Sequence, residues 1–291
     1  METLIAKAKI LIEALPYIKA FYGQTVVVKY GGAAMVDDHL KDEVMQDLVL
    51  MKYVGMKPVV VHGGGPEITR VLEQMGRKSE FVDGRRVTDA ASMEVIEMVL
   101  VGKLNQEIVA AINRHGGLAV GLSGKDGGLL KVRKLAHQQV DLGFVGEIKQ
   151  VRPDVIHALD REKFIPVIAP VGVDDAGQTY NINADDVAAA IAGSLSADKF
   201  ILLTDVPGIL RDPADPASLI SSLPLAEVEG LVKSGVIKGG MLPKVQACTR
   251  ALQGGVHKAH IINGKVSHAL LLELFTDRGI GTELRRSEEP A

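Results

Sequence analysis

The sequence VVVHGGGPE at residues 59–67 joins a β-branched run to a turn of three glycines and a proline. The valines suit a strand buried on both faces, and the glycines let the backbone turn tightly and approach a ligand without Cβ interference. Pro66 suits the first turn of a following helix, where its missing N–H costs nothing. The stretch therefore predicts a buried strand, a glycine turn and a helix whose free N–H groups face an anion.

The same design occurs earlier, in VVVKYGG at residues 26–32, where Lys29 ends the valine run. One glycine turn by itself can be a steric requirement of an α/β loop. Two such turns on successive strands, one of them with a lysine, favour a bound phosphate. His62 is expected to orient the second glycine turn.

Short apolar runs alternate with longer amphipathic segments along the chain. The predicted strands are 25–29, 58–62, 118–122, 165–169, 199–204 and 258–262, and the predicted helices are 37–54, 66–76, 89–114, 184–195, 225–234, 240–254 and 267–276. This alternation predicts an α/β fold with a mostly parallel sheet and helices on both faces. Residues 128–152 instead alternate apolar and polar side chains around Asp141-Leu142-Gly143, which predicts a hairpin at the sheet rim.

Length and composition limit the function classes. The 291 residues suit two domains or one large α/β unit. The nearest candidate for a domain boundary lies around residues 183–200. The net charge of −3 argues against nucleic acid or a membrane surface as the partner. The single Cys248 excludes a multi-cysteine metal site, and His257 and His260 have no further ligand at metal spacing, so we expect no protein-bound metal. No run reaches the ~18 apolar residues of a membrane helix and no signal-peptide pattern is present, so a cytoplasmic protein is expected.

The first 22 residues form a separate amphipathic pattern. Leu4, Ala8, Leu11, Leu15, Ile18 and Tyr22 follow the helical period of 3.6 residues. Pro16 removes one backbone donor and is expected to kink this helix. Two interpretations remain open: the helix folds back on its own domain, or its apolar face needs another subunit.

The common nucleotide-binding motifs are absent. The chain has no G-x-x-x-x-G-K-[ST], and no G-x-G-x-x-G follows a strand, which argues against a nicotinamide or flavin enzyme. Three other segments combine glycines with charged residues: NINADD (181–186), TDVPGIL (204–210) and KGGMLPK (238–244). Asn183 is a good helix N-cap, but capping leaves Asn181 and at least one of the two aspartates that follow without an explanation.

Seven segments, taken in order, resemble the amino-acid kinase family. They are VVVKYGGAAM (26–35), VVVHGGGPEI (59–68), DGRRVTDA (83–90), IEMVLVGKLN (96–105), NINADDVAAA (181–190), LLTDVPGIL (202–210) and IKGGMLPKV (237–245). The resemblance implies a three-layer αβα sandwich around a central, mainly parallel sheet. It also implies an oligomerisation helix at 1–22, an N-lobe at 23–195 for the acyl substrate and a C-lobe at 196–291 for ATP.

Within the family, the resemblance implies transfer of the γ-phosphoryl group of ATP to the side-chain carboxylate of N-acetyl-L-glutamate, the second step of arginine biosynthesis. A carboxylate with a pKa of about 4.3 is already ionised at neutral pH, so this reaction needs no general base. The obstacle is repulsion between the anionic nucleophile and the polyphosphate, which positioning and positive charge overcome.

The resemblance also implies a role for each site residue. Lys29 and Lys244 would contact the phosphoryl group from opposite sides, and Asp185 would orient both lysines. Arg86 would pair with the α-carboxylate of the substrate, a bidentate task that suits a guanidinium. Arg85 is the less favoured candidate for this task, and the alternative is that it is a solvated neighbour. The remaining residues are Gly64, Gly65 and Asn181 for the acyl substrate, Gly31, Gly32 and Gly64 for phosphate, and Asp205, Val206, Gly208, Leu210, Gly239 and Met241 for the nucleotide. Mg²⁺ would be held mainly by the ATP phosphates.

A further resemblance concerns regulation. Members of the family that L-arginine inhibits carry an N-terminal helix like residues 1–22, which joins dimers into a hexamer, and a C-terminal stretch like residues 268–282. By this resemblance, Glu273 of this chain would hold the guanidinium of arginine, and glycine N–H groups would bind the carboxylate of arginine. The implied effector residues are Tyr17, His268, Glu273, Gly279 and Gly281. Binding of the nitrogen-signalling protein PII, found in some photosynthetic organisms, is left undecided.

Several alternatives remain. Within the family, these are carbamate, aspartate, glutamate and uridylate kinases, and the choice of an N-acetylated substrate over a free amine rests on resemblance alone. From another class, the chain could be an arginine-sensing scaffold, or the kinase-like half of an acetyltransferase fusion, without turnover. The lysines at 29 and 244 and the aspartate at 185 argue against an inactive site.

Overall fold

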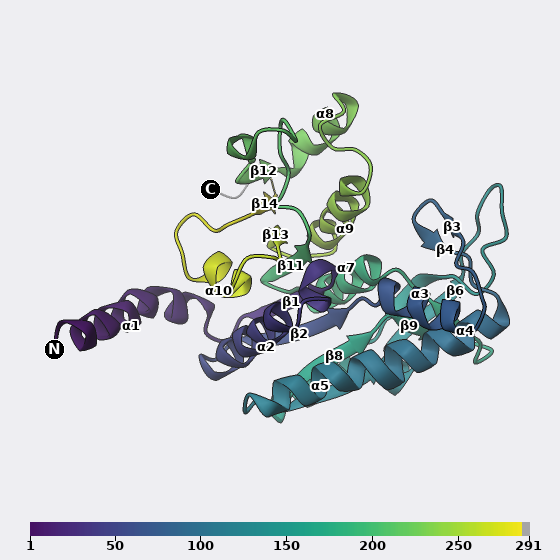
Figure 1. The fold of residues 1–291 in the computed structure, drawn as a ribbon, viewed down its shortest axis with the longest axis horizontal. Helices are drawn as coiled ribbons and strands as arrows, with labels where there is room; N and C mark the ends of the chain where they lie inside the picture. Colours follow the sequence, from purple (N-terminus) through teal and green to yellow (C-terminus); the bar gives the residue numbers. More distant parts are fainter. Residues whose placement is uncertain (287–291) are drawn as a thin grey trace.

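A computed structural model describes residues 1–286, and an eight-stranded sheet forms its centre (Figure 1). In spatial order the strands are β12 (Ser222–Pro224), β14 (Thr282–Arg285), β13 (Lys258–Asn263), β11 (Lys199–Thr204), β1 (Thr25–Tyr30), β2 (Lys57–His62), β8 (Ile165–Ala169) and β5 (Ala119–Ser123). Every neighbouring pair is parallel except β13 with β14. The mainly parallel sheet predicted from the sequence is therefore confirmed.

Helices cover both faces of this sheet because successive valines of its central strands point in opposite directions. On one face, Val27 packs in the same apolar cluster as α7 and α9, whereas Val26 and Val28 pack on the other face with α2 and α5. The helices are α2 (Asp38–Tyr53), α5 (Asn105–Arg114) and α10 (Ala269–Leu274) on one side, and α6 (Asp154–Arg161), α7 (Ala184–Ser194) and α9 (Met241–Gln253) on the other. The result is the expected αβα sandwich.

Smaller elements surround the carboxyl ends of β1 and β2. The helices there are α3 (Gly65–Gln74) and α4 (Ala90–Glu97), and a two-stranded hairpin of β3 (Phe81–Val82) and β4 (Arg85–Arg86) lies beside them. A second sheet has the order β10 (Thr179–Asn181), β9 (Val171–Val173), β6 (Leu130–Lys134) and β7 (Gly146–Val151). The antiparallel pairing of β6 with β7 confirms the predicted hairpin, but the two strands belong to this second sheet and not to the rim of the main one. The short helix α8 (Val228–Lys233) lies on the same side of the molecule as β12 and α9.

The predicted helix at 89–114 is interrupted by a π-helical segment, Met98–Leu104, between α4 and α5. Sequence periodicity did not reveal this segment. It brings Leu100 and Leu104 against Gly64, where a Cβ would overlap both side chains. The π segment therefore underlies the second glycine turn, and such segments are frequent at functional sites.

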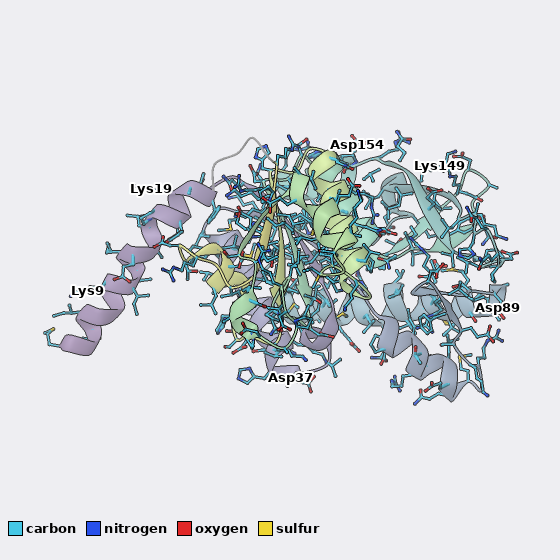
Figure 2. All side chains as sticks on the ribbon, turned by 90° about the horizontal axis from the view of Figure 1, so that it is seen from above. Lys9, Lys19, Asp37, Asp89, Lys149 and Asp154 are labelled. Carbon is cyan, nitrogen blue, oxygen red and sulfur yellow. The ribbon has the colours of Figure 1, made fainter. Side chains whose placement is uncertain are left out.

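The N-terminal helix α1 (Glu2–Phe21) projects away from the sandwich (Figures 1 and 2). Its last turns touch the body, where the rings of Tyr17 and Phe21 pack edge-on against Phe275. Ile10, Leu11 and Ile12 are exposed. Folding of this helix back on its own domain is therefore wrong, and its apolar side chains are left without a cover in the single chain.

The predicted division at residue 195 cuts across a continuous sheet. Strand β1 pairs in parallel with both β2 and β11, so the two parts of the chain share one set of backbone hydrogen bonds. In the described part of the chain, no helix has the length and apolar character that a bilayer span requires.

Candidate functional site

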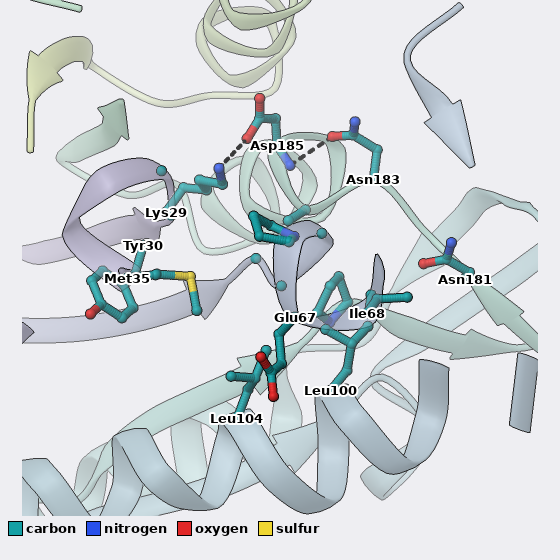
Figure 3. Close-up of a pocket in the computed structure, with 18 of the residues that line it drawn as sticks. Lys29, Tyr30, Met35, Glu67, Ile68, Leu100, Leu104, Asn181, Asn183 and Asp185 are labelled. Atoms are coloured by element: carbon teal, nitrogen blue, oxygen red, sulfur yellow. Dashed lines mark hydrogen bonds and ion pairs between the residues drawn. The ribbon is translucent and has the colours of Figure 1, made fainter. Parts of the chain in front are cut away.

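A cavity of about 640 Å³ lies at the carboxyl ends of β1 and β2, where the glycine turns begin (Figure 3). Parallel strands place their carboxyl ends at one edge of the sheet, so side chains from distant parts of the sequence meet there. Among the residues singled out from the sequence, the cavity is lined by Lys29, Gly31, Gly32, Gly64, Gly65, Arg85, Arg86, Asn181 and Asp185.

Two lysines face one aspartate at this edge. Nζ of Lys29, at the end of β1, lies 3.0 Å from Oδ1 of Asp185, and Nζ of Lys244, on α9, lies 3.8 Å from Oδ2. Asn183 caps α7, because its side-chain oxygen accepts from the N–H of Asp185 and of Asp186. Burial acts to raise the pKa of Asp185, but the charges of both lysines outweigh it and hold that pKa below its ordinary value. The site therefore holds one ionised carboxylate between two ammonium groups.

Charged side chains lie so close to Gly31 and Gly32 that these two positions have no room for a side chain. The Lys29 side chain passes directly over Gly31, where a Cβ would overlap its ammonium group. Gly32 has a φ of +69°, which favours glycine, and it lies against the carboxylate of Asp205. By contrast, a Cβ at Gly65 would meet no atom within 4 Å, so this residue faces open space. Backbone N–H groups can therefore approach a ligand from both turns.

Arg86 is buried on β4 and held by neutral oxygens. Its guanidinium donates to the carbonyl of Gly65 at 2.9 Å, to Oγ1 of Thr69 at 2.8 Å and to Oγ of Ser79. It also lies 4.6 Å from the ring centre of Phe81. None of these partners carries a charge, so the group remains available to an anion. The hydroxyls of Ser79 and Thr69 were not found from the sequence.

Asn181, the last residue of β10, lies at the far side of the cavity from Lys29 (Figure 3). Its amide nitrogen is 3.4 Å from Oγ1 of Thr88. The amide therefore has remaining hydrogen-bonding capacity for a polar ligand group.

Arg85 differs from the solvated neighbour that the alternative predicts. It forms an ion pair with Asp186, 3.1 Å between Nη2 and Oδ2, and Asp186 also pairs with Arg250 on α9. Adjacent aspartates at the start of α7 thus bind separate sets of cations: Asp185 the two lysines and Asp186 the two arginines. This arrangement ties the β3–β4 hairpin to α9.

The residues expected to bind the nucleotide do not line this cavity. They follow β11 or lie at the start of α9, on the C-terminal side of the sheet. Ile209 donates its N–H to Oγ1 of Thr282, and Gly208 lies so close to the same threonine that a Cβ would overlap it. Leu210 forms an isolated bridge with Leu219. The remaining members of this set are Asp205, Val206, Gly239 and Met241.

The residues expected to bind arginine gather where α1 meets α10. Tyr17 donates to Asp277, and His268, in a left-handed conformation with a φ of +50°, lies 2.6 Å from a carboxylate oxygen of Asp47. The N–H groups of Ile280 and Gly281 donate to Glu273 itself. The expectation that the Gly281 N–H is free for a ligand carboxylate does not match this arrangement. Gly279 has a φ of +61° and turns the chain beside Glu273.

His260, to which the sequence assigned no role, belongs to a buried polar network. Its Nδ1 lies 2.7 Å from Oε1 of Glu273, and its Nε2 lies 3.2 Å from Nζ of Lys199. Burial lowers the pKa of His260. The same burial acts to raise the pKa of Glu273, but His260, the N–H of Ile280 and the charge of Lys199 together outweigh it and lower that pKa. A histidine inside a strand covered on both faces requires such partners, and this was the signal available in the sequence.

In the region from residue 1 to residue 286, no cluster of three or more histidine, cysteine or acidic side chains forms a metal site. The carboxylate of Asp185 faces two ammonium groups and is a poor Mg²⁺ ligand. This donor set fits a Mg²⁺ ion that arrives on the phosphates of a nucleotide, because Mg²⁺ keeps several waters and uses few protein ligands.

Comparisons with known proteins agree with this architecture. Residues 24–263 match the model of the amino acid kinase family. The chain is 59% identical to an acetylglutamate kinase from Moorella thermoacetica, over 96% of this chain and 97% of that protein. It is 60% identical to an acetylglutamate kinase from Syntrophomonas wolfei, over 95% of this chain and 96% of that protein.

Several solved structures share the fold of this chain. An N-acetylglutamate synthase from Neisseria gonorrhoeae, complexed with coenzyme A and N-acetyl-glutamate, is 27% identical with a TM-score of 0.85; the alignment covers 97% of this chain but only 64% of the synthase. The synthase complexed with coenzyme A and L-arginine is 25% identical, with a TM-score of 0.81 over 96% of this chain and 65% of the synthase. A carbamate kinase from Giardia lamblia bound to AMP-PNP shares the fold, with a TM-score of 0.66 and 18% identity over 91% of this chain and 99% of that kinase.

Proposed function

This chain belongs to the amino acid kinase family, and from that premise we propose that it moves the γ-phosphoryl group of ATP to the side-chain carboxylate of N-acetyl-L-glutamate. The products are ADP and N-acetyl-L-glutamyl 5-phosphate, in arginine biosynthesis. The observation that carries this proposal is the pair of lysines facing Asp185 beside two glycine turns. Acetylglutamate kinases that are 56–60% identical over nearly the full chain support the choice of acceptor.

The mechanism follows from charge. The acceptor carboxylate is already ionised at neutral pH and needs no base, so the chain must offset its repulsion from the polyphosphate. Lys29 and Lys244 approach the transferring group from two sides and stabilise the charge that spreads over its oxygens. Asp185 holds both ammonium groups in position by the contacts of 3.0 and 3.8 Å.

The acyl substrate occupies the cavity at the N-terminal half. Arg86 binds its α-carboxylate, and Asn181 and the backbone at Gly65 bind its polar groups, because these donors line the same cavity and keep unused capacity. Leu100, Leu104 and Ile182 provide apolar lining for the methylene chain and the acetyl methyl group.

ATP occupies the C-terminal side. Its phosphates reach the N–H groups of Gly31, Gly32 and Gly64, and its nucleoside lies against the segments at 205–210 and 239–241. Mg²⁺ is carried by the phosphates, where it offsets part of their negative charge. The predicted lobes, 23–195 for the acyl substrate and 196–291 for ATP, then meet along the pairing of β1 with β11.

L-Arginine is the proposed inhibitor. A synthase of the same fold, 25% identical to this chain, is solved with L-arginine, and the candidate effector residues meet at the junction of α1 and α10. Because Glu273 already accepts from His260 and two backbone N–H groups, arginine binding there requires the guanidinium to share or displace one of these donors. The hydrogen bonds around Glu273 therefore rearrange when arginine binds.

The test is release of ADP from MgATP with five acceptors, namely N-acetyl-L-glutamate, L-glutamate, L-aspartate, carbamate and UMP, each with and without millimolar L-arginine. Turnover with N-acetyl-L-glutamate alone supports the proposed reaction, and suppression by arginine supports the effector site. Turnover with another acceptor assigns a different kinase activity. No turnover with any acceptor favours an arginine-binding scaffold, which calorimetry with arginine then tests.

A further inference from the structure

His62 is a buried histidine at the end of β2, directly before the glycine turn of residues 63–65. Its ring is fully shielded from solvent. Nδ1 lies 2.8 Å from the carbonyl oxygen of Gly63, and Nε2 lies 3.3 Å from Nδ2 of Asn105. The ring therefore connects the first peptide of the turn to the start of α5.

Asn105 determines which nitrogen of this ring carries the proton. Its Nδ2 also lies 2.9 Å from the carbonyl oxygen of Val167 and 3.4 Å from that of Leu122. Carbonyl oxygens only accept hydrogen bonds, so the –NH₂ end of the amide must face them, and the same end faces His62. Nε2 of His62 is then an acceptor, and the single proton of the neutral ring is on Nδ1.

The ring stays neutral around physiological pH, because burial lowers the pKa of His62 to about 4. Nδ1 consequently donates to the carbonyl of Gly63, which is turned inward, beneath the loop. A trans peptide is planar, so its C=O and the following N–H point in opposite directions. The N–H of Gly64 is therefore turned outward, on the side of the cavity that Gly64 lines.

Two other features support this geometry. The N–H of Gly63 donates to the carbonyl of Tyr30 at 2.8 Å, which ties the second glycine turn to the first. Gly121 makes room for Asn105, because a Cβ at this position would overlap the amide oxygen. Asn105 also follows directly on the π segment that ends at Leu104, so the break in helical register sets the position of its amide.

We propose that His62, held in one tautomer by Asn105, is a positioning residue that fixes the Gly63–Gly64 peptide with the Gly64 N–H directed at the transferring phosphoryl group. The identity of that group rests on the proposed function; the orientation of the peptide does not. His62 itself contacts no substrate. It sets a backbone donor in advance, so that no reorientation is needed when charge develops in the transition state.

A matched pair of variants separates the two hydrogen bonds of the ring. His62→Asn keeps an N–H donor near the place of Nδ1 and loses the link to Asn105. His62→Gln extends its amide toward Asn105 and loses the donor to Gly63. We expect kcat of His62→Gln to fall about 10²- to 10³-fold, as when one oxyanion donor is removed, and kcat of His62→Asn to stay within about tenfold of the wild type. KM for both substrates should change little in either variant.

Crystal structures of the two variants give a second measurement that is independent of activity. The Gly63 carbonyl should leave its inward orientation in His62→Gln and keep it in His62→Asn. Equal kcat values in the two variants, or an unchanged peptide in His62→Gln, would overturn the proposal. If the wild type shows no turnover, the proposed function fails while the peptide orientations still decide the role of His62.

The wild-type protein provides a test that no folding defect can obscure. NMR of protein with ¹⁵N-labelled histidine distinguishes the two neutral tautomers. We expect His62 as the Nδ1–H form. Detection of the Nε2–H form would overturn the proposal, because Nδ1 could then not donate to Gly63.

Discussion

Nζ of Lys29 lies 3.0 Å from Oδ1 of Asp185, although 156 positions separate the two residues in the sequence. Lys29 is the penultimate residue of β1 and Asp185 is the second residue of α7, so the contact forms only when the helix packs on the sheet. Both side chains are largely buried, and Lys244 brings a second ammonium group to the same carboxylate, so the three groups together carry a net positive charge. The contact places a fixed positive charge at the mouth of the first glycine turn.

Lys29→Ala should lower kcat about 10²- to 10³-fold while the protein stays folded, because the lysine acts on charge that develops in the transition state. The pKa of Asp185 should rise, since one of the positive charges that lower it is removed. ADP release under saturating substrates measures the first effect. Lys149→Ala is the control, since this lysine is half-exposed in the second sheet. A wild-type kcat in Lys29→Ala would exclude the lysine from the reaction.

Arg86→Lys should raise KM for the acyl substrate about ten- to a hundredfold with a smaller change in kcat. The lysine keeps the charge but loses the planar fork that donates to Gly65 and Thr69 and binds a carboxylate with two parallel bonds. Arg85→Lys is the matched control, because an ammonium group can still pair with Asp186. Initial rates over a range of acceptor concentrations give both parameters. Equal effects at the two positions would contradict the assignment to Arg86.

Asp186→Asn should raise KM for the acyl substrate about two- to tenfold and leave kcat nearly unchanged. The substitution breaks the ion pairs with Arg85 and Arg250, and partly exposed pairs of this kind contribute about 0.2–1 kcal/mol each. The hairpin that carries Arg86 then loses its tie to α9. Asp175→Asn, which removes an exposed acidic group paired with Lys131, is the control. A fall in kcat with unchanged KM would place Asp186 in the chemical step instead.

The stability of the protein should depend on pH through His62. Its pKa is lowered from 6.5 to about 4 by burial, so the unfolded chain binds more protons than the folded chain between these values. The free energy of unfolding therefore falls as the pH decreases, by about 2 kcal/mol between pH 7.5 and pH 5.0 from this residue. Urea denaturation of the wild type and of His62→Asn at both pH values isolates the contribution. An identical pH dependence in the two proteins would contradict the lowered pKa.

Removal of residues 1–22 should leave dimers if α1 joins dimers into a hexamer, as the resemblance to arginine-inhibited members implies. The exposed side chains of Ile10, Leu11 and Ile12 are available for such a contact. The single substitution Leu11→Asp should have the same effect, because it places a charge in the apolar contact. Sedimentation velocity measures the assembly. Met75→Asp, at an exposed methionine beyond α3, is the control. A hexamer that survives the deletion would contradict the assembly.

Much of the fold was predictable, because the deciding signals are local. The valine runs gave β1 and β2, the glycine turns gave their ends, and Asn183 gave the start of α7. The π segment at 98–104 was missed, since its apolar residues are compatible with an ordinary helix and its contact with Gly64 is a tertiary one.

The candidate site was predicted in part. Lys29, Asp185 and Lys244 were found from the sequence, but Ser79 and Thr69 beside Arg86 were not, because hydroxyl side chains carry no pattern that marks them as partners of an arginine. The two hydroxyls accept from Arg86 only when the β3–β4 hairpin lies beside α3.

The sequence by itself determined the α/β alternation, the two glycine turns and the presence of lysines at strand and helix ends, because periodicity and backbone chemistry act over a few residues. Only the tertiary structure decided which groups meet: Asp185 with both lysines, Asp186 with Arg85 and Arg250, and Glu273 with His260 instead of open solvent. Such contacts depend on strand order and on the packing of helices from distant parts of the chain, and no local preference of a residue specifies its partner.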